Sequence, residues 1–216
     1  MNLIASKKSI NLLISAEVSS EAYYNKLLTH PTWPKGESGV TIGIGYDLGQ
    51  MSSEAITEDW KDYVSVEDLH TMLSVSGLKG TKAQAALPKT KKVTVTFDSA
   101  CQVFYKRSLP KFAKMTRGIY PGLELLEPDA VGALISMVYN RGAALNGPGR
   151  VEMKSIVHLV PVKDYAGIAA MVLHSKRLWV GKNGMAGIIT RRTTEANYIA
   201  NAVHEYNSDE LVTIEI

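Results

Sequence analysis

One acidic residue near the N-terminus is placed where it could do acid–base chemistry. Glu17 lies in a stretch with helical periodicity, about two dozen residues ahead of the glycine-rich segment of residues 38–49, which includes Thr41 and Asp47. A positioned carboxylic acid can protonate a leaving group, while a second carboxylate orients or deprotonates water. Most glycoside hydrolases use two carboxylic acids in this way. An acid on a helix followed by a polar hairpin therefore suggests hydrolysis of a glycosidic bond.

The apolar residues around Glu17 predict the helix that carries it. They recur at helical spacing over residues 9–29, with Ser9 as the expected N-cap and Pro31 after the run: Ile10, Leu13, Ile14, Tyr24 and Leu28. Glu17 follows Leu13 by four residues, so we expect it on the inward-facing stripe. Burial there disfavours the charged form of a carboxyl group, as a general acid requires. The alternative is an acid at the edge of the stripe that reaches solvent or pairs with a basic residue.

The segment after this helix predicts a short hairpin. Residues that favour strands alternate with glycine or aspartate: Thr41, Ile42, Ile44, Tyr46 and Leu48 against Gly43, Gly45 and Asp47. Glycines within strands let another backbone or a ligand approach closely. The segment lacks the Gly-Lys-Ser/Thr ending of a phosphate loop and the third glycine of a dinucleotide site. A tight hairpin with a purely structural role explains the glycines equally well.

Four blocks of sequence resemble one family. The helix with Glu17 and the TIGIG run of residues 41–45 resemble the N-terminal lobe of phage-type lysozymes, the muramidases of glycoside hydrolase family 24. Residues 95–100 (VTFDSA) resemble the start of the long helix that joins that family's two lobes, and residues 133–142 (ALISMVYNRG) the core helix of its C-terminal lobe. Residues 187–195 (GIITRRTTE) are similar to its Gly-Leu-x-x-Arg-Arg-x-x-Glu signature. The blocks occur in the family's order.

The resemblance implies an α+β fold that is predominantly helical and lysozyme-like. A small N-terminal lobe with a β-hairpin and a helical C-terminal lobe would be joined by a long helix, as one domain over residues 1–216. Residues 1–92 would hold the first helix, the hairpin and an inserted segment, 51–92, which lacks the family's motifs. Residues 93–216 would hold the linking helix and the helical lobe. Helical patterns occur at about 65–75, 97–117 with a break or bend at Pro110, 127–142, 151–160, 163–174 and 188–206.

The resemblance also implies an activity, namely hydrolysis of the β-1,4 bond between N-acetylmuramic acid and N-acetylglucosamine with inversion at the anomeric carbon. Glu17 would be the general acid, and Thr41 would position the water. The family's aspartate has no counterpart here, since no aspartate lies between Val18 and Val40. We favour Asp47, inside the hairpin, as the second carboxylate over Glu37, which lies in a polar turn. A carboxylate that only caps the turn is the alternative for Asp47.

Further residues are expected to bind substrate. Asn140 ends the core helix where the family's cleft lies and could bond a sugar amide, while Tyr46 and Trp33 could stack on sugar faces or pack in the core. In the family an arginine of the Arg-Arg block approaches the catalytic glutamate, which implies that Arg191 or Arg192 tunes Glu17. The alternative is that both arginines pair with acids such as Glu195.

The composition of the chain limits its size class, its partners and its metal chemistry. The 216 residues are 45% hydrophobic and 21% charged, enough for a sizeable core in one domain or two closely packed lobes. The net charge of +3 favours an acidic polymer such as the bacterial cell wall. Cys101 is alone, which excludes an intrachain disulfide, and the five histidines lack metal-ligand spacing. We expect no metal and no cofactor.

The expected partner is bacterial peptidoglycan, with an immunity protein or a delivery machine as further candidates, and the protein is expected to be a monomer. Residues 1–9 lack the apolar run and cleavage site of a secretory signal, and no apolar stretch reaches spanning length. We therefore expect synthesis in the cytoplasm, no membrane insertion, and action in the periplasm or cell wall after release or delivery. Three other functions stay open: a lytic transglycosylase, a non-catalytic wall-binding or virion module with a lysozyme fold, and a nucleic-acid-binding protein. The last lacks clustered basic and aromatic residues.

Overall fold

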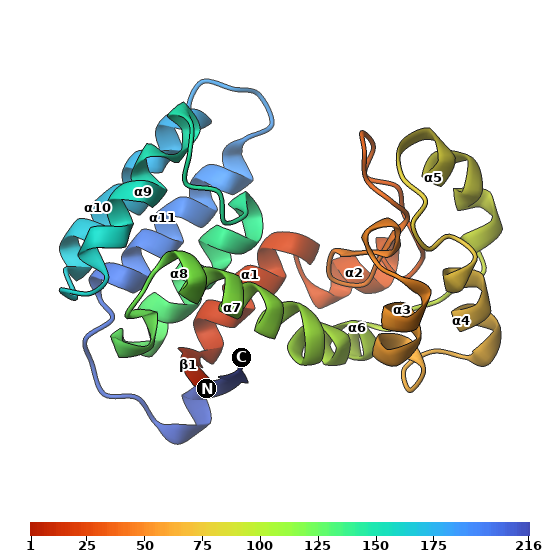
Figure 1. The fold of residues 1–216 in the computed structure, drawn as a ribbon, viewed down its shortest axis with the longest axis horizontal. Helices are drawn as coiled ribbons and strands as arrows, with labels where there is room; N and C mark the ends of the chain where they lie inside the picture. Colours follow the sequence, from red (N-terminus) through yellow and green to blue (C-terminus); the bar gives the residue numbers. More distant parts are fainter. The chain divides into compact units, whose positions relative to one another are not determined.

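The computed structural model describes all 216 residues and shows a predominantly helical α+β chain with two small antiparallel sheets (Figure 1). It confirms the predicted fold class at this level. Two compact units are present. Residues 17–108 form one, which we call the hairpin unit, and residues 1–16 with 109–216 form the other, which we call the helical unit. The first sixteen residues therefore belong with the C-terminal part of the chain, and the boundary expected near residue 92 lies at residue 108.

The ends of the chain pair with each other in the helical unit. Strand β1, Asn2–Ser6, lies antiparallel to β4, Leu211–Glu215, with Leu3 opposite Ile214. Figure 1 shows the two termini side by side. Leu3 and Ile214 are buried beneath this ribbon. Neither strand was predicted, because the partner of each lies about two hundred residues away in the sequence.

Helix α8, Pro128–Arg141, is the centre of the helical unit, and every residue from Asp129 to Val138 is buried. Pro128 occupies the first turn, where its missing N–H costs nothing, and Gly142 ends the helix at a positive φ of 71°. A helix that is apolar on all sides is expected at the centre of a core. Around it lie α7 (Leu109–Ile119), α9 (Val151–Leu159), α10 (Tyr165–His174) and α11 (Ala186–Ala200). α7 and α11 contact α8, and α10 packs between α9 and α11.

The hairpin unit contains the small sheet and short helices. Its strands are β2, Thr41–Ile42, and β3, Tyr46–Asp47. Its helices are α2 (Glu21–Leu27), α3 (Ser53–Trp60), α4 (Val66–Leu73), α5 (Gly80–Ala86) and α6 (Phe97–Val103). Four of these helices begin at a hydroxyl residue whose side chain accepts a backbone N–H, namely Ser20, Ser52, Ser65 and Thr96. The helix predicted near residues 65–75 is confirmed as α4.

The single helix predicted over residues 9–29 is wrong. Helix α1, Lys7–Val18, ends at Ser19, whose φ is +64°, and α2 begins after the cap Ser20. A positive φ at a non-glycine residue interrupts helical hydrogen bonding, which the apolar spacing on either side does not reveal. Ser9 is not an N-cap, since it lies inside α1 and its hydroxyl donates to the Ser6 carbonyl at 2.8 Å.

The long helix predicted over residues 97–117 is interrupted before Pro110. A π-helical segment, Phe104–Ser108, separates α6 from α7, and Pro110 lies in the first turn of α7. Helical residues precede Pro110 without a gap, so its missing N–H and its ring disturb the turn before it, where the π-helical segment lies. The helix expected to reach residue 206 ends at Ala200. Short 3₁₀ turns complete the chain: Leu48–Gln50, Leu87–Thr90, Leu123–Leu125, Pro148–Arg150, Ser175–Leu178 and Ser208–Glu210. None of the helices combines the length and apolar character needed to cross a membrane.

Candidate functional site

Thr41 and Asp47 face each other across the hairpin. The register of β2 and β3 places Thr41 opposite Asp47 and Ile42 opposite Tyr46. Directly opposed residues of an antiparallel pair project from the same face with Cβ atoms roughly 4.5–5.5 Å apart. Both Thr41 and Asp47 are half-buried, so this face is partly open to solvent. The hairpin thus brings together two of the three residues predicted to be catalytic.

The Asp47 carboxylate is held by backbone N–H groups. The amide of Gly39 donates to both carboxylate oxygens at 3.1 Å, and the amide of Gly49 donates to Oδ1 at 2.8 Å. The structural role considered for Asp47, as a cap of the turn, is therefore present. A carboxylate offers about four lone-pair positions, so three N–H donors still leave room for a water molecule. The group is fixed in orientation and keeps some capacity to act on water.

Glu17 lies in the last turn of α1 and is exposed. The expectation that it faces inward is wrong, because the buried stripe passes through Leu13, Ile14 and then Val18. Position 17 lies four residues after Leu13 and position 18 lies four residues after Ile14, so the apolar spacing fitted both positions. Exposure leaves the carboxyl group accessible to a ligand. Burial within the protein therefore does not supply the desolvation that was expected.

Tyr46 is part of the core of the hairpin unit. Its ring is 7% exposed and meets Trp60 edge-on at a centroid distance of 5.4 Å. Its hydroxyl donates to Asp59 at 2.8 Å, and burial, followed by this bond, raises the pKa of Tyr46 above its ordinary value. The ring cannot stack on a sugar, so the predicted substrate contact is wrong and the packing alternative is correct. Trp33, by contrast, is half-buried, with its Nε1 donating to the Ser38 carbonyl at 3.0 Å.

Glu37, the other candidate for the second carboxylate, is exposed in a turn. The turn includes Lys35 and Gly36, both at positive φ. Glu37 and Trp33 line the same surface hollow of about 550 Å³, together with residues at the start of α5. Neither Thr41 nor Asp47 lines this hollow. The structure thus places Glu37 with a different set of residues from the hairpin pair.

In the helical unit, Arg191 and Arg192 belong to a buried polar network that sequence reasoning anticipated only as an alternative. Glu195 Oε1 accepts hydrogen bonds from the Arg192 guanidinium at 2.7 Å and from the Ser136 hydroxyl at 2.6 Å. Arg191 donates to the Ser136 hydroxyl at 3.1 Å and to the Ser136 carbonyl at 3.0 Å. Burial raises the pKa of Glu195 and lowers the pKa of Arg192 to about 10, since both charges lie out of water. Ser136, which joins α8 to α11, was missed.

Asn140, in the last turn of α8, is exposed.

A second buried acid of the helical unit, Glu152, makes a pH-dependent contribution to stability. It accepts from Arg177 at 2.5 Å and contacts the His174 ring at 3.0 Å. Burial alone raises the pKa of Glu152, but these bonds outweigh it and lower that pKa below its ordinary value. A folded-state pKa below the unfolded value stabilises the protein above the unfolded pKa of about 4.3. That stabilisation is lost as the pH falls through the folded-state pKa.

We therefore expect the loss of unfolding free energy between about pH 6 and pH 3 to be smaller in Glu152→Gln than in the unchanged protein. Urea unfolding at several pH values in this range measures it. Glu205→Gln, which removes an exposed acid of the same unit, is the control and should keep the original pH dependence. Parallel curves for Glu152→Gln and the unchanged protein would contradict the assignment.

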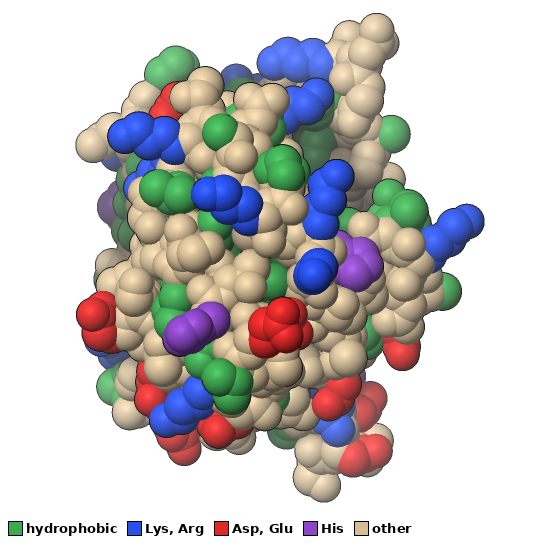
Figure 2. Space-filling model, turned by 90° about the vertical axis from the view of Figure 1, so that its right-hand side faces the viewer, with side chains coloured by type: hydrophobic (Ala, Val, Ile, Leu, Met, Phe, Trp, Pro, Cys, Tyr) green, Lys and Arg blue, Asp and Glu red, His purple; other side chains and the backbone are tan.

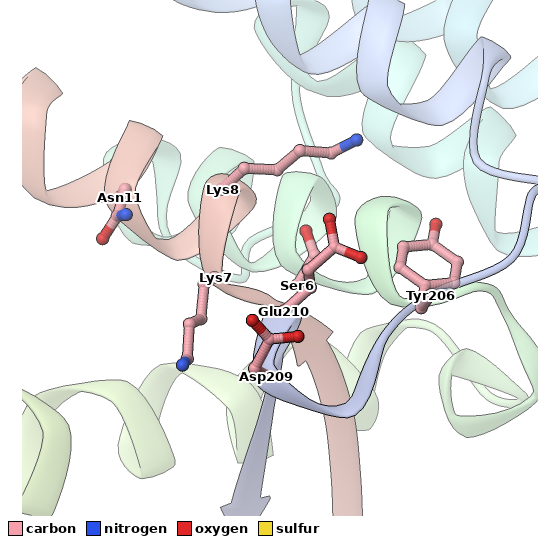
Figure 3. Close-up of a pocket in the computed structure, with 7 residues that line it drawn as sticks. All are labelled: Ser6, Lys7, Lys8, Asn11, Tyr206, Asp209 and Glu210. Carbon is pink, nitrogen blue, oxygen red and sulfur yellow. The ribbon is translucent and has the colours of Figure 1, made fainter.

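A small hollow of about 270 Å³ lies beside β1 in the helical unit (Figure 3). Lys7, Lys8 and Asn11 approach it from α1, and Tyr206, Asp209 and Glu210 from the segment that precedes β4. None of the predicted site residues lines it.

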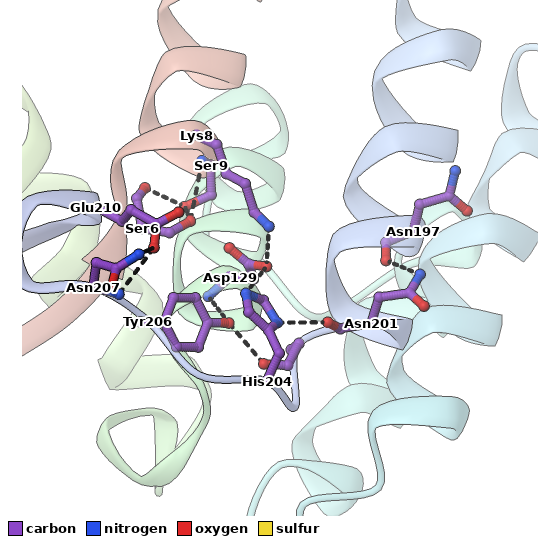
Figure 4. A network of polar contacts seen from close by, with 11 residues as sticks. Ser6, Lys8, Ser9, Asp129, Asn197, Asn201, His204, Tyr206, Asn207 and Glu210 are labelled. Carbon is purple, nitrogen blue, oxygen red and sulfur yellow. Dashed lines mark hydrogen bonds and ion pairs between the residues drawn. The ribbon is translucent and has the colours of Figure 1, made fainter.

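The same segment is fastened to α8 by a polar network (Figure 4). Asp129, which is buried, pairs with Lys8 at 2.7 Å, and its backbone N–H donates to the Tyr206 hydroxyl at 3.4 Å. Tyr206 in turn donates to the Ala202 carbonyl at 2.7 Å. This arrangement anchors the C-terminal segment, which accounts for the polar residues structurally.

No cluster of three or more His, Cys, Asp or Glu side chains has an arrangement that could hold a metal ion.

A family model described as a domain of unknown function, DUF8812, matches residues 15–117. No curated protein matches the chain. The matched segment is the hairpin unit with short extensions on either side, so this part of the chain is similar to a domain whose function has not been assigned.

Proposed function

We propose that the protein is a lysozyme-like peptidoglycan hydrolase that cleaves the β-1,4 bond between N-acetylmuramic acid and N-acetylglucosamine. The observation that supports this most directly is the pairing of Thr41 with Asp47 on one partly open face of a hairpin. A hydroxyl and an oriented carboxylate are the groups needed to hold and deprotonate a water molecule. The substrate and the reaction are inferred from the ordered blocks of sequence that resemble phage-type lysozymes.

Glu17 is the general acid in this proposal. Its carboxyl proton goes to the glycosidic oxygen as the bond to the anomeric carbon breaks. Because Glu17 is exposed, a bound glycan strand would be the element that covers it and removes water from it. Removal of water favours the protonated form of a carboxyl group.

Asp47 takes up the proton from the attacking water, and the Thr41 hydroxyl positions that water. The amides of Gly39 and Gly49 hold the Asp47 carboxylate so that little reorganisation is needed during the reaction. The water oxygen bonds to the anomeric carbon on the face opposite the leaving group, which inverts the configuration. Proton donation by Glu17 and proton removal by Asp47 balance each other within one turnover.

Asn140 and Arg191 have supporting roles. The exposed amide of Asn140 suits a hydrogen bond to the acetamido group of a sugar. Arg191 is buried and bonds Ser136, so it positions the core of the helical unit. The setting we propose is the periplasm or cell wall, reached after release or delivery.

Analysis of the products of digested peptidoglycan tests the proposal. Digestion in ¹⁸O-labelled water followed by mass spectrometry should give reducing muramic acid ends that carry one labelled oxygen. Anhydromuramyl ends without reducing ends would contradict hydrolysis and support a lytic transglycosylase. Unchanged glycan strands that nevertheless retain the protein would support a wall-binding module without catalysis.

Two substitutions separate the candidates for the second carboxylate. Asp47→Asn should lower the free energy of unfolding by about 1–3 kcal/mol, since an amide nitrogen replaces Oδ2 and turns its N–H groups toward the Gly39 amide, which is itself a donor. It should also slow wall hydrolysis at least about tenfold. Glu37→Gln should change unfolding by less than about 0.5 kcal/mol, because Glu37 is exposed. Urea unfolding and turbidity loss of cell walls measure both effects, and a variant Glu37→Gln that folds but no longer hydrolyses would assign the role to Glu37.

A further inference from the structure

The acidic and the basic residues of the hairpin unit lie in separate stretches of its sequence. Residues 69–97 contain five lysines and no acidic residue, and all five are exposed: Lys79, Lys82, Lys89, Lys91 and Lys92. Residues 47–68 contain seven acidic residues and one lysine. Figure 2 shows one face with most of its basic side chains in the upper half and most of its acidic side chains at mid-height and below. Segregation of this kind attracts an anionic ligand to one part of a surface.

Two of these lysines line the hollow that also contains Trp33 and Glu37, which we call the Trp33 hollow. Its other lining residues are Thr81, Gly36, Gly77 and Gly80, and its volume is about 550 Å³. A Cβ atom built at Gly36 or Gly77 would meet no other atom within 4 Å, so the backbone at these points faces open space. The hollow is therefore open to a ligand at these two glycines.

The walls of the Trp33 hollow are tied together. Gly39 pairs with Lys79 in an isolated antiparallel bridge, and the amide of Gly80 donates to the Ser38 carbonyl at 3.1 Å. The same Ser38 carbonyl accepts from the Trp33 indole, which holds the ring, and the Lys79 ammonium donates to the Gln50 side chain at 2.9 Å. A site with fixed walls loses little conformational freedom when a ligand binds.

We infer that the Trp33 hollow binds the carboxylate-bearing part of a peptidoglycan strand, namely a sugar with its stem peptide. This inference rests on the proposed function and specifies which part of that substrate the hairpin unit recognises. The ammonium groups of Lys79 and Lys82 pair with the free carboxylates of the stem peptide. The half-buried Trp33 ring offers an apolar face to a sugar, and Glu37 accepts hydrogen bonds from hydroxyl or amide groups.

The composition of the Trp33 hollow disfavours a nucleic acid. A continuous polyphosphate backbone would bring negative charge against Glu37. Sites for single-stranded nucleic acid also use several aromatic rings on which successive bases stack, whereas Trp33 is the aromatic residue among those lining this hollow. A ligand with scattered carboxylates and many hydroxyl and amide groups fits both features.

The experiment compares two double substitutions of equal charge in the full-length protein. Both are made in a Glu17→Gln background so that the ligand is not consumed. Lys79→Gln with Lys82→Gln removes the ammonium groups of the Trp33 hollow, and Lys91→Gln with Lys92→Gln removes two exposed lysines outside it. The probe is a disaccharide tetrapeptide from peptidoglycan, titrated by calorimetry. We expect about tenfold weaker binding for the first pair and less than about twofold for the second, because exposed ion pairs each contribute up to about fivefold.

A second probe, in which the stem-peptide carboxylates are amidated, should bind equally to both double variants. Equal affinity of the two variants for the unmodified probe would overturn the inference. Tighter binding of a short oligothymidine than of the disaccharide tetrapeptide would overturn it as well. Hydrolysis of cell walls by the unchanged protein is measured separately. Lysine-dependent binding without hydrolysis would overturn the proposed reaction and leave the binding site, whereas hydrolysis without lysine-dependent binding would overturn the binding site alone.

Discussion

Replacement of Glu17 by glutamine is expected to lower kcat for peptidoglycan hydrolysis by about 10²–10⁴-fold, the range typical for loss of general acid–base catalysis. Glutamine keeps the size of the side chain and its hydrogen-bonding capacity but cannot donate a carboxyl proton to the glycosidic oxygen. Binding of the glycan strand should change little, so the effect should appear in kcat rather than in KM. Release of reducing ends from purified cell walls measures the rate.

Glu21→Gln is the matched control for this experiment. Glu21 is also exposed and lies four residues further along, in the first turn of α2. Its replacement should leave the rate within about twofold of the unchanged protein, as is usual for surface substitutions away from a site. Circular dichroism and urea unfolding of both variants establish that they are folded. A folded Glu17→Gln variant that clears cell walls at the original rate would remove Glu17 from the mechanism.

The largest effect on stability is expected from Glu195→Gln. Glu195 and Arg192 are fully buried, and Arg191 is nearly so. Glu195 Oε1 lies 2.7 Å from Arg192 and 3.3 Å from Arg191. Removing one partner of a buried ion pair leaves an uncompensated charge, which typically costs about 3–5 kcal/mol. We expect a loss of this size in the free energy of unfolding, measured with urea at neutral pH.

Glu124→Gln is the control for the buried pair. Glu124 accepts two bonds from Arg117, both at 3.2 Å, but this pair lies at the surface. Exposed pairs contribute about 0–1 kcal/mol, so geometry alone does not predict a large loss. A change below about 1 kcal/mol in Glu195→Gln would show that Glu195 is protonated in the folded protein, because a neutral acid is replaced by an amide at little cost.

Local signals in the sequence account for much of the fold. The helical pattern of residues 127–142 is confirmed as α8, which is buried from Asp129 to Val138. The helical pattern of residues 65–75 is confirmed as α4, and the alternating glycines predict the hairpin of β2 and β3. Each of these signals acts over a few residues, through a cap, a periodicity or a backbone angle. Such interactions form in the same way wherever the segment lies in the protein.

The candidate site was predictable in part. Asp47 was chosen for its place inside the hairpin and Thr41 through the family resemblance, and their pairing follows from the short turn of the hairpin. The exposure of Glu17 was not predicted, because positions 17 and 18 both lie four residues after an apolar residue, Leu13 or Ile14. Tyr46 was expected at a sugar, but its place against Trp60 and Asp59 depends on α3, which lies later in the chain.

The sequence by itself determined the helical class, most helix positions and the hairpin, since these depend on neighbouring residues. Only the tertiary structure decided which polar residues are satisfied in the core and which remain available to a ligand. Ser136 meets Glu195 across 59 positions, and β1 meets β4 from opposite ends of the chain. Trp33 and Lys79 line one hollow for the same reason. Contacts between distant segments form only when the chain between them is ordered, at a cost in conformational entropy, so no local pattern specifies them.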